Sequence, residues 1–284
     1  MEFHSLEDTY TLNNGVKIPV IGFGTWQTPN GDIAKASVEA AINAGYRHID
    51  TAAAYGNEES VGRGIKDSGI NRHDLFLTSK LWNNAHSYEA AKKAIDTSLL
   101  KLDTDYLDLY LIHWPNPVSI RSHWAESNAE TWRAMEEAVK AGKIRAIGIS
   151  NFRRHHIDEL LKTAEIKPAV NQICLNPGVT EPELVKVNEE NGFLNEAYSP
   201  LGTGGMLGNE TVKEVADHYG KSTAQVLIRW SLQHGFLPLP KSVHPDYIKA
   251  NADVFDFEIS PEDMTELDSL NGTGHVTDPD EADF

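Results

Sequence analysis

Residues 75–113, LFLTSKLWNNAHSYEAAKKAIDTSLLKLDTDYLDLYLIH, contain the clearest structural pattern of the chain. Short apolar runs at about 75–79 and 107–112 have the length and composition of buried strands. The segment between them, SYEAAKKAIDTSLLKL, repeats its apolar residues at helical spacing. Two buried strands joined by a helix predict a βαβ unit, whose strands lie parallel in one sheet.

The same alternation continues on both sides of this unit. Helical patterns such as IAKASVEAAINAG and TWRAMEEAVKAG, several of them ending at glycine, separate further apolar runs. These runs predict strands at about 20–23, 46–50, 145–149, 170–173, 193–197 and 236–240. A hairpin precedes them in YTLNNGVKIPV, where Asn14-Gly15 is the turn signal.

Eight strands separated by eight helices, with no linker or break in composition, predict a single α/β domain over residues 1–284. We expect a closed (β/α)8 TIM barrel whose N-terminal hairpin covers its bottom. The competing fold is an open doubly wound sheet, which carries a phosphate-binding glycine loop after its first strand. The first connection, GFGTWQTPNG, lacks the G-x-G-x-x-G spacing. The later cluster of Gly202, Gly204 and Gly205 does not have this spacing either. Those three glycines are predicted to form a flexible loop.

Composition narrows the range of partners. The 284 residues carry a formal net charge of −17, which disfavours nucleic acid and anionic membranes as partners. The single cysteine, Cys174, excludes a disulfide framework and multi-cysteine metal sites. The start, MEFHSLEDTY, lacks the features of a signal peptide, and no apolar run reaches the length of a membrane span. We therefore expect a cytoplasmic protein, and the absence of an apolar stripe favours a monomer.

Polar side chains follow nearly every predicted strand. In TIM barrels the chemistry takes place at the carboxyl ends of the strands, so a ring of such residues predicts an active-site mouth. The ring contains Thr25, Trp26, Asp50, Lys80, His113, Ser150, Asn151, Gln172, Tyr198, Ser199, Lys241 and Ser242.

Four side chains of this mouth suggest a proton donor. Tyr55 follows Asp50 in the loop DTAAAYGNEESVG, while Lys80 and His113 end the next two strands. A free tyrosine has a pKa near 10, and a nearby ammonium lowers it by stabilising the phenolate. Taken singly, Asp50 could cap a helix, Tyr55 could be a half-buried aromatic residue and Lys80 a solvated charge. Together at one barrel mouth, they favour acid catalysis at a carbonyl oxygen.

Several segments resemble the motifs of the aldo-keto reductase family, in order, from about residue 10 to 260. They are GYRHIDTAAAYGNEESVG, LFLTSKLW, DYLDLYLIHWP, IGISNF, NQI, AYSPLG and PKSV. The stretch HWPNPVSIRSHWAESNAETWRAMEE is most similar to the bacterial 2,5-diketo-D-gluconate reductase-like branch. The resemblance implies reduction of aldehydes and ketones, including dicarbonyl or keto-sugar compounds, with NADPH.

The resemblance also implies residue roles. Tyr55 would be the general acid, Lys80 would lower its pKa, Asp50 would pair with Lys80, and His113 would orient the carbonyl. The substrate pocket would contain Tyr55 and His113 and be walled by Trp26, Trp82 and Trp114, although each tryptophan could instead pack in the core. The implied cofactor contacts are Thr25, Trp26, Asp50, Ser150, Asn151, Gln172, Tyr198, Ser199, Leu201, Gly202, Lys241, Ser242, Val243, His244, Tyr247 and Asn251.

One position departs from the family pattern. Where the family commonly has an arginine that pairs with the 2′-phosphate of NADPH, this chain has Tyr247, preceded by Asp246. Tyrosine cannot make the charged, bidentate contact of a guanidinium. We therefore expect NADPH to be preferred by a smaller margin, with NADH also accepted.

Two other function classes fit the sequence less well. A metal-dependent hydrolase would need clustered ligands, but the 12 histidines are scattered and no H-E-x-x-H is present. His155-His156 are expected on the surface at the start of the helix after the fifth barrel strand. A non-catalytic, cofactor-binding barrel would be expected to have a damaged catalytic set or an added segment.

The outer wall of the substrate pocket is expected to come from loops around 114–130 and 203–210 and from the tail after about 272.

Overall fold

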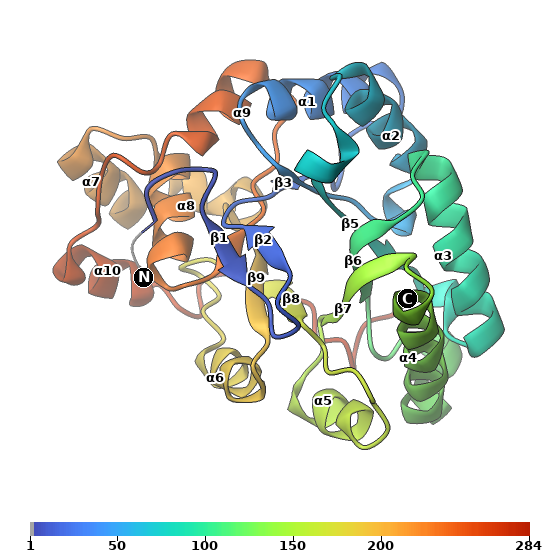
Figure 1. The fold of residues 1–284 in the computed structure, drawn as a ribbon. Coiled ribbons are helices and arrows are strands. Elements are labelled where there is room, and N and C mark those ends of the chain that lie inside the picture. Colours follow the sequence, from blue (N-terminus) through green and yellow to red (C-terminus); the bar gives the residue numbers. More distant parts are fainter. Residues whose placement is uncertain (1–2) are drawn as a thin grey trace.

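The computed structural model describes residues 3–284 and has the predicted alternation of strands and helices (Figure 1). The parallel strands are β3 Phe23–Gly24, β4 His48–Asp50, β5 Phe76–Leu81, β6 Leu107–Ile112, β7 Ile144–Ser150, β8 Val170–Cys174, β9 Leu194–Tyr198 and β10 Leu237–Pro238. The helices are α1 Asp32–Asn43, α2 Glu58–Asp67, α3 Tyr88–Leu102, α4 Trp124–Lys140, α5 Arg154–Leu161, α6 Pro182–Asn191, α7 Glu210–Tyr219, α8 Thr223–Gln233, α9 Pro245–Ala252 and α10 Pro261–Asp268.

The eight strands pair in chain order from β3 to β10, and the sheet closes on itself. Closure comes from two backbone hydrogen bonds, Gly22 N–H to the Pro238 carbonyl at 3.1 Å and Gly24 N–H to the Pro240 carbonyl at 3.0 Å. A Cβ on Gly22 would lie 2.5 Å from the Leu239 side chain and 2.6 Å from His48 Nδ1, so a larger residue at this seam would force both side chains to shift. The predicted TIM barrel is confirmed.

The two seam strands are shorter than predicted. The run at 20–23 contributes only Phe23–Gly24, and the run at 236–240 contributes only Leu237–Pro238. Prolines 238 and 240 have no N–H, so the last strand can accept hydrogen bonds at these positions but not donate them. Residues 3–284 contain ten α-helices rather than the predicted eight, because α7 and α8 both lie between β9 and β10, and α9 and α10 both follow β10. Gly220, in the left-handed conformation, ends α7, and Ser222 caps α8.

The hairpin predicted at the chain start is present. It consists of β1 Thr9–Thr11 and β2 Lys17–Pro19, joined by a turn in which Gly15 has a φ of 86°. Figure 1 shows this pair lying across one end of the barrel. The Tyr10 hydroxyl donates to the Phe236 carbonyl, next to the start of β10, at 2.9 Å. The hairpin therefore covers the amino-terminal end of the strands, as predicted.

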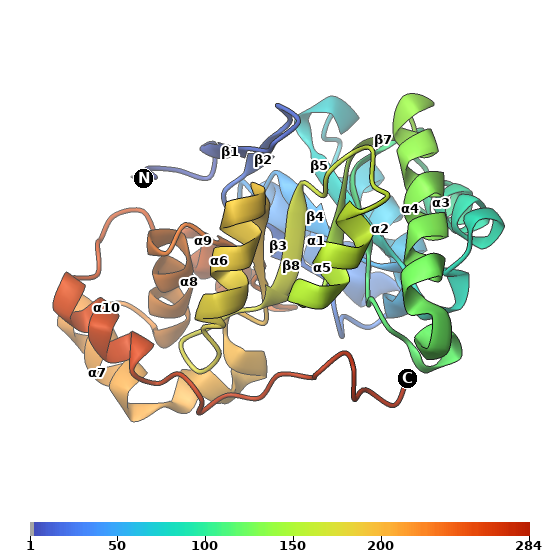
Figure 2. The same cartoon turned by 90° about the horizontal axis from the view of Figure 1, so that it is seen from below.

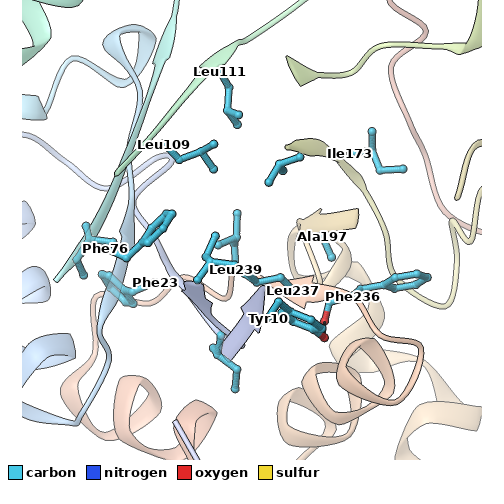
Figure 3. Close-up of a cluster of buried hydrophobic side chains, with 14 of the residues drawn as sticks. Tyr10, Phe23, Phe76, Leu109, Leu111, Ile173, Ala197, Phe236, Leu237 and Leu239 are labelled. Carbon is cyan, nitrogen blue, oxygen red and sulfur yellow. Dashed lines mark hydrogen bonds between the residues drawn. The ribbon is translucent and has the colours of Figure 1, made fainter. Parts of the chain in front are cut away.

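The core fills the barrel and the layer between the barrel and its helices. Figure 3 shows part of it, where Leu109 and Leu111 from β6 and Ile173 from β8 gather with the seam residues Leu237 and Leu239. Within residues 3–284, no helix combines the length and apolar composition needed to cross a bilayer. The packed interior leaves the opposite, carboxyl ends of the strands to form the site.

Candidate active site

A cavity of about 710 Å³ opens at the carboxyl ends of the barrel strands. Parallel strands present these ends at one rim, so residues far apart in sequence meet there. Most of the residues predicted from the sequence line the cavity. These are Trp26, Asp50, Tyr55, Trp82, His113, Trp114, Asn151, Gln172, Tyr198, Ser199, Leu201 and Lys241.

Lys80 is the centre of a buried charged cluster at this rim. Its Nζ donates hydrogen bonds to Asp50 Oδ1 at 2.6 Å, to the Thr51 carbonyl at 2.9 Å and to the Tyr55 hydroxyl at 3.1 Å. These three contacts use all three N–H groups of the ammonium, so its position is fixed. β4 and β5 are hydrogen-bonded neighbours, which brings Asp50 and Lys80 together.

The electrostatics of this cluster correct one sequence-based expectation. Burial raises the pKa of Tyr55 above its ordinary value, and the adjacent Lys80 ammonium only reduces that rise. Burial would lower the pKa of Lys80, but the Asp50 carboxylate outweighs it, and the pKa lies above its usual range. Tyr55 therefore holds its proton at neutral pH beside a permanent positive charge.

His113 lies beside Tyr55 and against the aromatic wall. Its ring centre is 5.8 Å from that of Tyr55 and 5.2 Å from that of Trp82. Burial, reinforced by the positive charge of Lys80, holds the pKa of His113 well below its ordinary value. The ring is therefore neutral at neutral pH and has one N–H with which to hold a substrate oxygen.

Gln172 is linked to the charged cluster from the opposite side of the barrel. Its Nε2 donates to Asp50 Oδ2 at 2.9 Å and to Glu196 Oε2 at 3.0 Å. Nearby, the Tyr198 hydroxyl donates to Asn151 Oδ1 at 2.7 Å, and Asn151 Nδ2 donates to the His113 carbonyl at 3.0 Å. Asn151 Nδ2 also donates to Ser150 Oγ at 3.3 Å, and Ser150 Oγ donates to the Gln172 carbonyl at 2.8 Å. Hydrogen bonds thus connect the predicted cofactor residues Gln172, Asn151 and Tyr198 to Asp50 and to the His113 backbone.

Four non-glycine residues at this rim have left-handed backbone conformations. The φ angles are 57° at Gln27, 61° at Asn151, 48° at Ser199 and 54° at Thr203, and all four line the cavity. Each such conformation costs on the order of 1 kcal/mol, and such residues concentrate at functional sites. Their clustering here is consistent with a binding site.

Some predicted contacts lie outside the cavity wall. Thr25 and Ser150 are buried behind it, where their hydroxyls donate to the carbonyls of Asp50 and Gln172. Gly202 begins the segment Gly202–Gly208, in which short 3₁₀ turns are separated by a kink at Thr203 and Gly204. The remaining ones lie on the segment between β10 and the end of α9: Ser242, Val243, His244, Tyr247 and Asn251. Asn251 is buried, whereas Tyr247 is 64% exposed.

The C-terminal tail supplies cavity residues that the sequence did not single out. His275, Val276, Thr277 and Phe284 line the cavity. Figure 2 shows the tail running from α10 toward the end of α4, on the side opposite the hairpin. The Phe284 ring packs 4.9 Å from Trp114 in an edge-to-face contact. The tail was expected to form part of the outer wall, but no local pattern marked these four residues.

Asp280 anchors this tail to the barrel. Its Oδ1 accepts hydrogen bonds from Asn116 Nδ2 at 2.8 Å and His156 Nε2 at 3.0 Å, and His155 Nε2 lies 3.0 Å from Oδ2. His156 is fully buried, so the surface location expected for it was wrong.

The donor atoms of His155, His156 and Asp280 lie within 4.8 Å of one another, close enough to surround a metal ion. However, His156 Nδ1 accepts a hydrogen bond from the Arg153 N–H, so the neutral ring carries its proton on Nε2. That proton is donated to Asp280 and occupies the direction that a metal would need. The group therefore serves as an anchor for the tail.

The model of the Aldo/keto reductase family matches residues 20–272. The chain belongs to this family. It is 50% identical over 281 residues to the glyoxal reductase of Bacillus subtilis (strain 168), and the match covers 99% of each chain.

Solved structures resemble this chain as well. MGS-M4, an aldo-keto reductase from a Medee basin deep-sea metagenome library, has a TM-score of 0.91 at 40% identity, and the match covers 97% of this chain and 100% of its own. A variant of Gox0644 in complex with NADPH has a TM-score of 0.91 at 35% identity over the full length of both chains. This aldo-keto reductase is therefore an NAD(P)H-dependent oxidoreductase that reduces carbonyl compounds, and the family predicted from its motifs is confirmed.

Proposed function

We propose that this aldo-keto reductase uses NADPH to reduce small aldehydes and ketones, with Tyr55 as the general acid. The observation that carries the proposal is the position of Lys80, whose ammonium holds both Asp50 and the Tyr55 hydroxyl at the cavity. Residues 1–284 would act as one barrel. Its cytoplasmic location and monomeric state stay predictions.

The residues at the cavity have separate roles in the reaction. When bound, the reduced nicotinamide supplies a hydride to the carbonyl carbon. The neutral His113 ring donates a hydrogen bond that orients the carbonyl oxygen. Tyr55 transfers its hydroxyl proton to that oxygen as negative charge develops there, and Lys80 stabilises the phenolate that remains. Asp50 keeps the ammonium charged and in place.

The donor and acceptor pattern fits a nicotinamide cofactor. Both Nε2 hydrogens of Gln172 are donated to carboxyl groups, which leaves its Oε1 as an acceptor for the cofactor's amide. Tyr198 lines the same cavity and offers an aromatic face for stacking. Lys241, which also lines it, would contribute positive charge toward the phosphates.

The substrate class follows from the pocket wall and from the relatives. Trp26, Trp82, Trp114 and Phe284 make the wall largely aromatic, around the polar Tyr55 and His113. Such a pocket suits a small carbonyl compound with limited polarity. The similarity to a glyoxal reductase supports dicarbonyl compounds as the first substrates to examine.

The test is the consumption of NADPH absorbance with glyoxal, methylglyoxal, a keto sugar and glyceraldehyde. We expect turnover with at least the dicarbonyl compounds. Tight binding of NADPH without turnover of any of them would favour the non-catalytic, cofactor-binding alternative instead.

Tyr247 is expected to limit the preference for NADPH. Tyr247→Arg should tighten NADPH binding by about 1–3 kcal/mol, the range for hydrogen bonds involving charged groups, and leave NADH nearly unchanged. The exposed side chain has room for this change. Measuring kcat/KM for both cofactors in both proteins tests it, and Tyr247→Met separates the added charge from the loss of the ring. A wild-type enzyme that does not use NADH, or an arginine variant without gain, would contradict this role.

The Asp280 anchor is expected to hold the tail against the substrate pocket. Asp280→Ala removes two hydrogen bonds and the contact with His155, so the tail should become mobile and the KM for the carbonyl substrate should rise about two- to tenfold. The Kd for NADPH should change little. Glu281→Ala, at the exposed neighbouring position, is the control. An unchanged KM in the Asp280 variant would show that the anchor does not shape the pocket.

A further inference from the structure

Glu196 is a buried carboxyl group that the proposed mechanism leaves without a role. It lies on β9 with no exposed side-chain surface, opposite Gln172 on β8 in the strand register. Its Oε2 accepts a hydrogen bond from Gln172 Nε2 at 3.0 Å. Its Oε1 has no hydrogen-bond partner within residues 3–284, and the nearest basic atom, His48 Nε2, is 4.0 Å away.

The surroundings of Glu196 favour the protonated acid. An ionised carboxylate needs partners for both oxygens when it is buried, and Oε1 has none. Burial, together with the negative charge of Asp50, raises the pKa of Glu196 to about 8. His48 cannot compensate a charge on Glu196, because burial lowers the pKa of His48 to about 3. Lys80, the other basic group near Glu196, is already paired with Asp50.

Glu196 and Asp50 hold the Gln172 amide from two sides. One hydrogen bond from Nε2 would leave the amide free to turn about that contact. Two hydrogen bonds, to carboxyl groups on β9 and β4, fix the plane of the amide as well as its position. The amide oxygen Oε1 is then kept apart from both carboxyl groups.

We propose that Glu196 is a positioning residue for the cofactor, which acts through Gln172. It fixes the Gln172 amide so that Oε1 remains available to the nicotinamide carboxamide. The inference rests on the proposed function, because it assumes a nicotinamide cofactor in this cavity. It adds Glu196, a residue with no exposed surface, to the residues that support cofactor binding.

The test compares a complete cofactor with a fragment that lacks nicotinamide. The Kd values of NADPH and of adenosine 2′,5′-bisphosphate are measured by titration calorimetry for the wild type, Glu196→Gln and Glu196→Met. Glu196→Met leaves one Gln172 N–H without an acceptor, so NADPH should bind about two- to tenfold more weakly, the range for one hydrogen bond. The fragment should bind as to the wild type. Glu196→Gln retains an acceptor oxygen and should restore NADPH binding.

A second measurement needs no cofactor. The folded chain keeps the Glu196 proton up to a pH of about 8. The unfolded chain releases it near the ordinary glutamate pKa of about 4. Between these values the folded state binds more protons, so the wild type should lose stability as pH rises, relative to Glu196→Gln. Thermal unfolding from acid to alkaline pH measures this difference.

The possible outcomes are distinguishable. Equal weakening of NADPH and the fragment in Glu196→Met would indicate a merely structural role. Unchanged NADPH binding in that variant would also overturn the proposal. A stability difference independent of pH would contradict the protonated state of Glu196. A wild-type protein that does not bind NADPH would contradict the proposed cofactor itself, and with it this inference.

Discussion

Replacing Tyr55 by phenylalanine should lower kcat about 100-fold or more, the usual scale for losing a general acid. The change removes the hydroxyl that Lys80 holds at 3.1 Å and leaves the ring and its contact with His113 in place. The Kd for NADPH should therefore stay close to the wild-type value. Steady-state kinetics with a dicarbonyl substrate and a cofactor titration together measure both quantities.

The pH dependence provides a control for this assignment. Reduction requires the protonated form of Tyr55, whose pKa is raised by burial. The wild-type rate should fall as pH rises through that pKa, and the residual rate of Tyr55→Phe should lack this fall. Full activity in the phenylalanine variant would assign the proton transfer elsewhere, with His113 as the next candidate.

Replacing Lys80 by methionine should damage both activity and stability. Asp50 would be left as a buried carboxylate without its cation, and breaking a buried ion pair in this way costs about 3–5 kcal/mol of unfolding free energy. Tyr55 would also lose the charge that stabilises its phenolate, so kcat should fall about 100-fold or more. Urea unfolding and steady-state kinetics measure the two effects.

Two further variants separate these effects. Lys80→Met combined with Asp50→Asn removes both charges, so much of the stability should return while the activity stays low. Lys66→Met breaks an ion pair with Asp103 whose side chains are 71% and 69% exposed, and it should cost less than about 1 kcal/mol. Equal losses of stability in Lys66→Met and Lys80→Met would contradict the buried-pair explanation.

The sequence by itself determined the barrel and the composition of its mouth. The spacing of apolar residues along the chain identifies each strand and helix from local sequence. Because the strands are parallel, the residues that follow them all lie at the same rim of the barrel. For this reason the sequence alone predicts that Asp50, Lys80 and His113, each at the end of a predicted strand, lie close together. Tyr55 joins this group because it follows Asp50 in the same loop. The resemblance to the family added the roles of these residues and of the other cofactor contacts.

Other features depended on contacts between distant segments, which no local pattern encodes. The seam between Gly22 and Pro238 exists only when the sheet closes, and Asp280 reaches Asn116 only after the tail has crossed the mouth. Burial decided the charge states as well. The ammonium beside Tyr55 predicted a lowered pKa, but the desolvation of the folded site outweighs it. No local pattern distinguishes Glu196 from an ordinary strand residue, and only the tertiary structure buries it completely against Gln172.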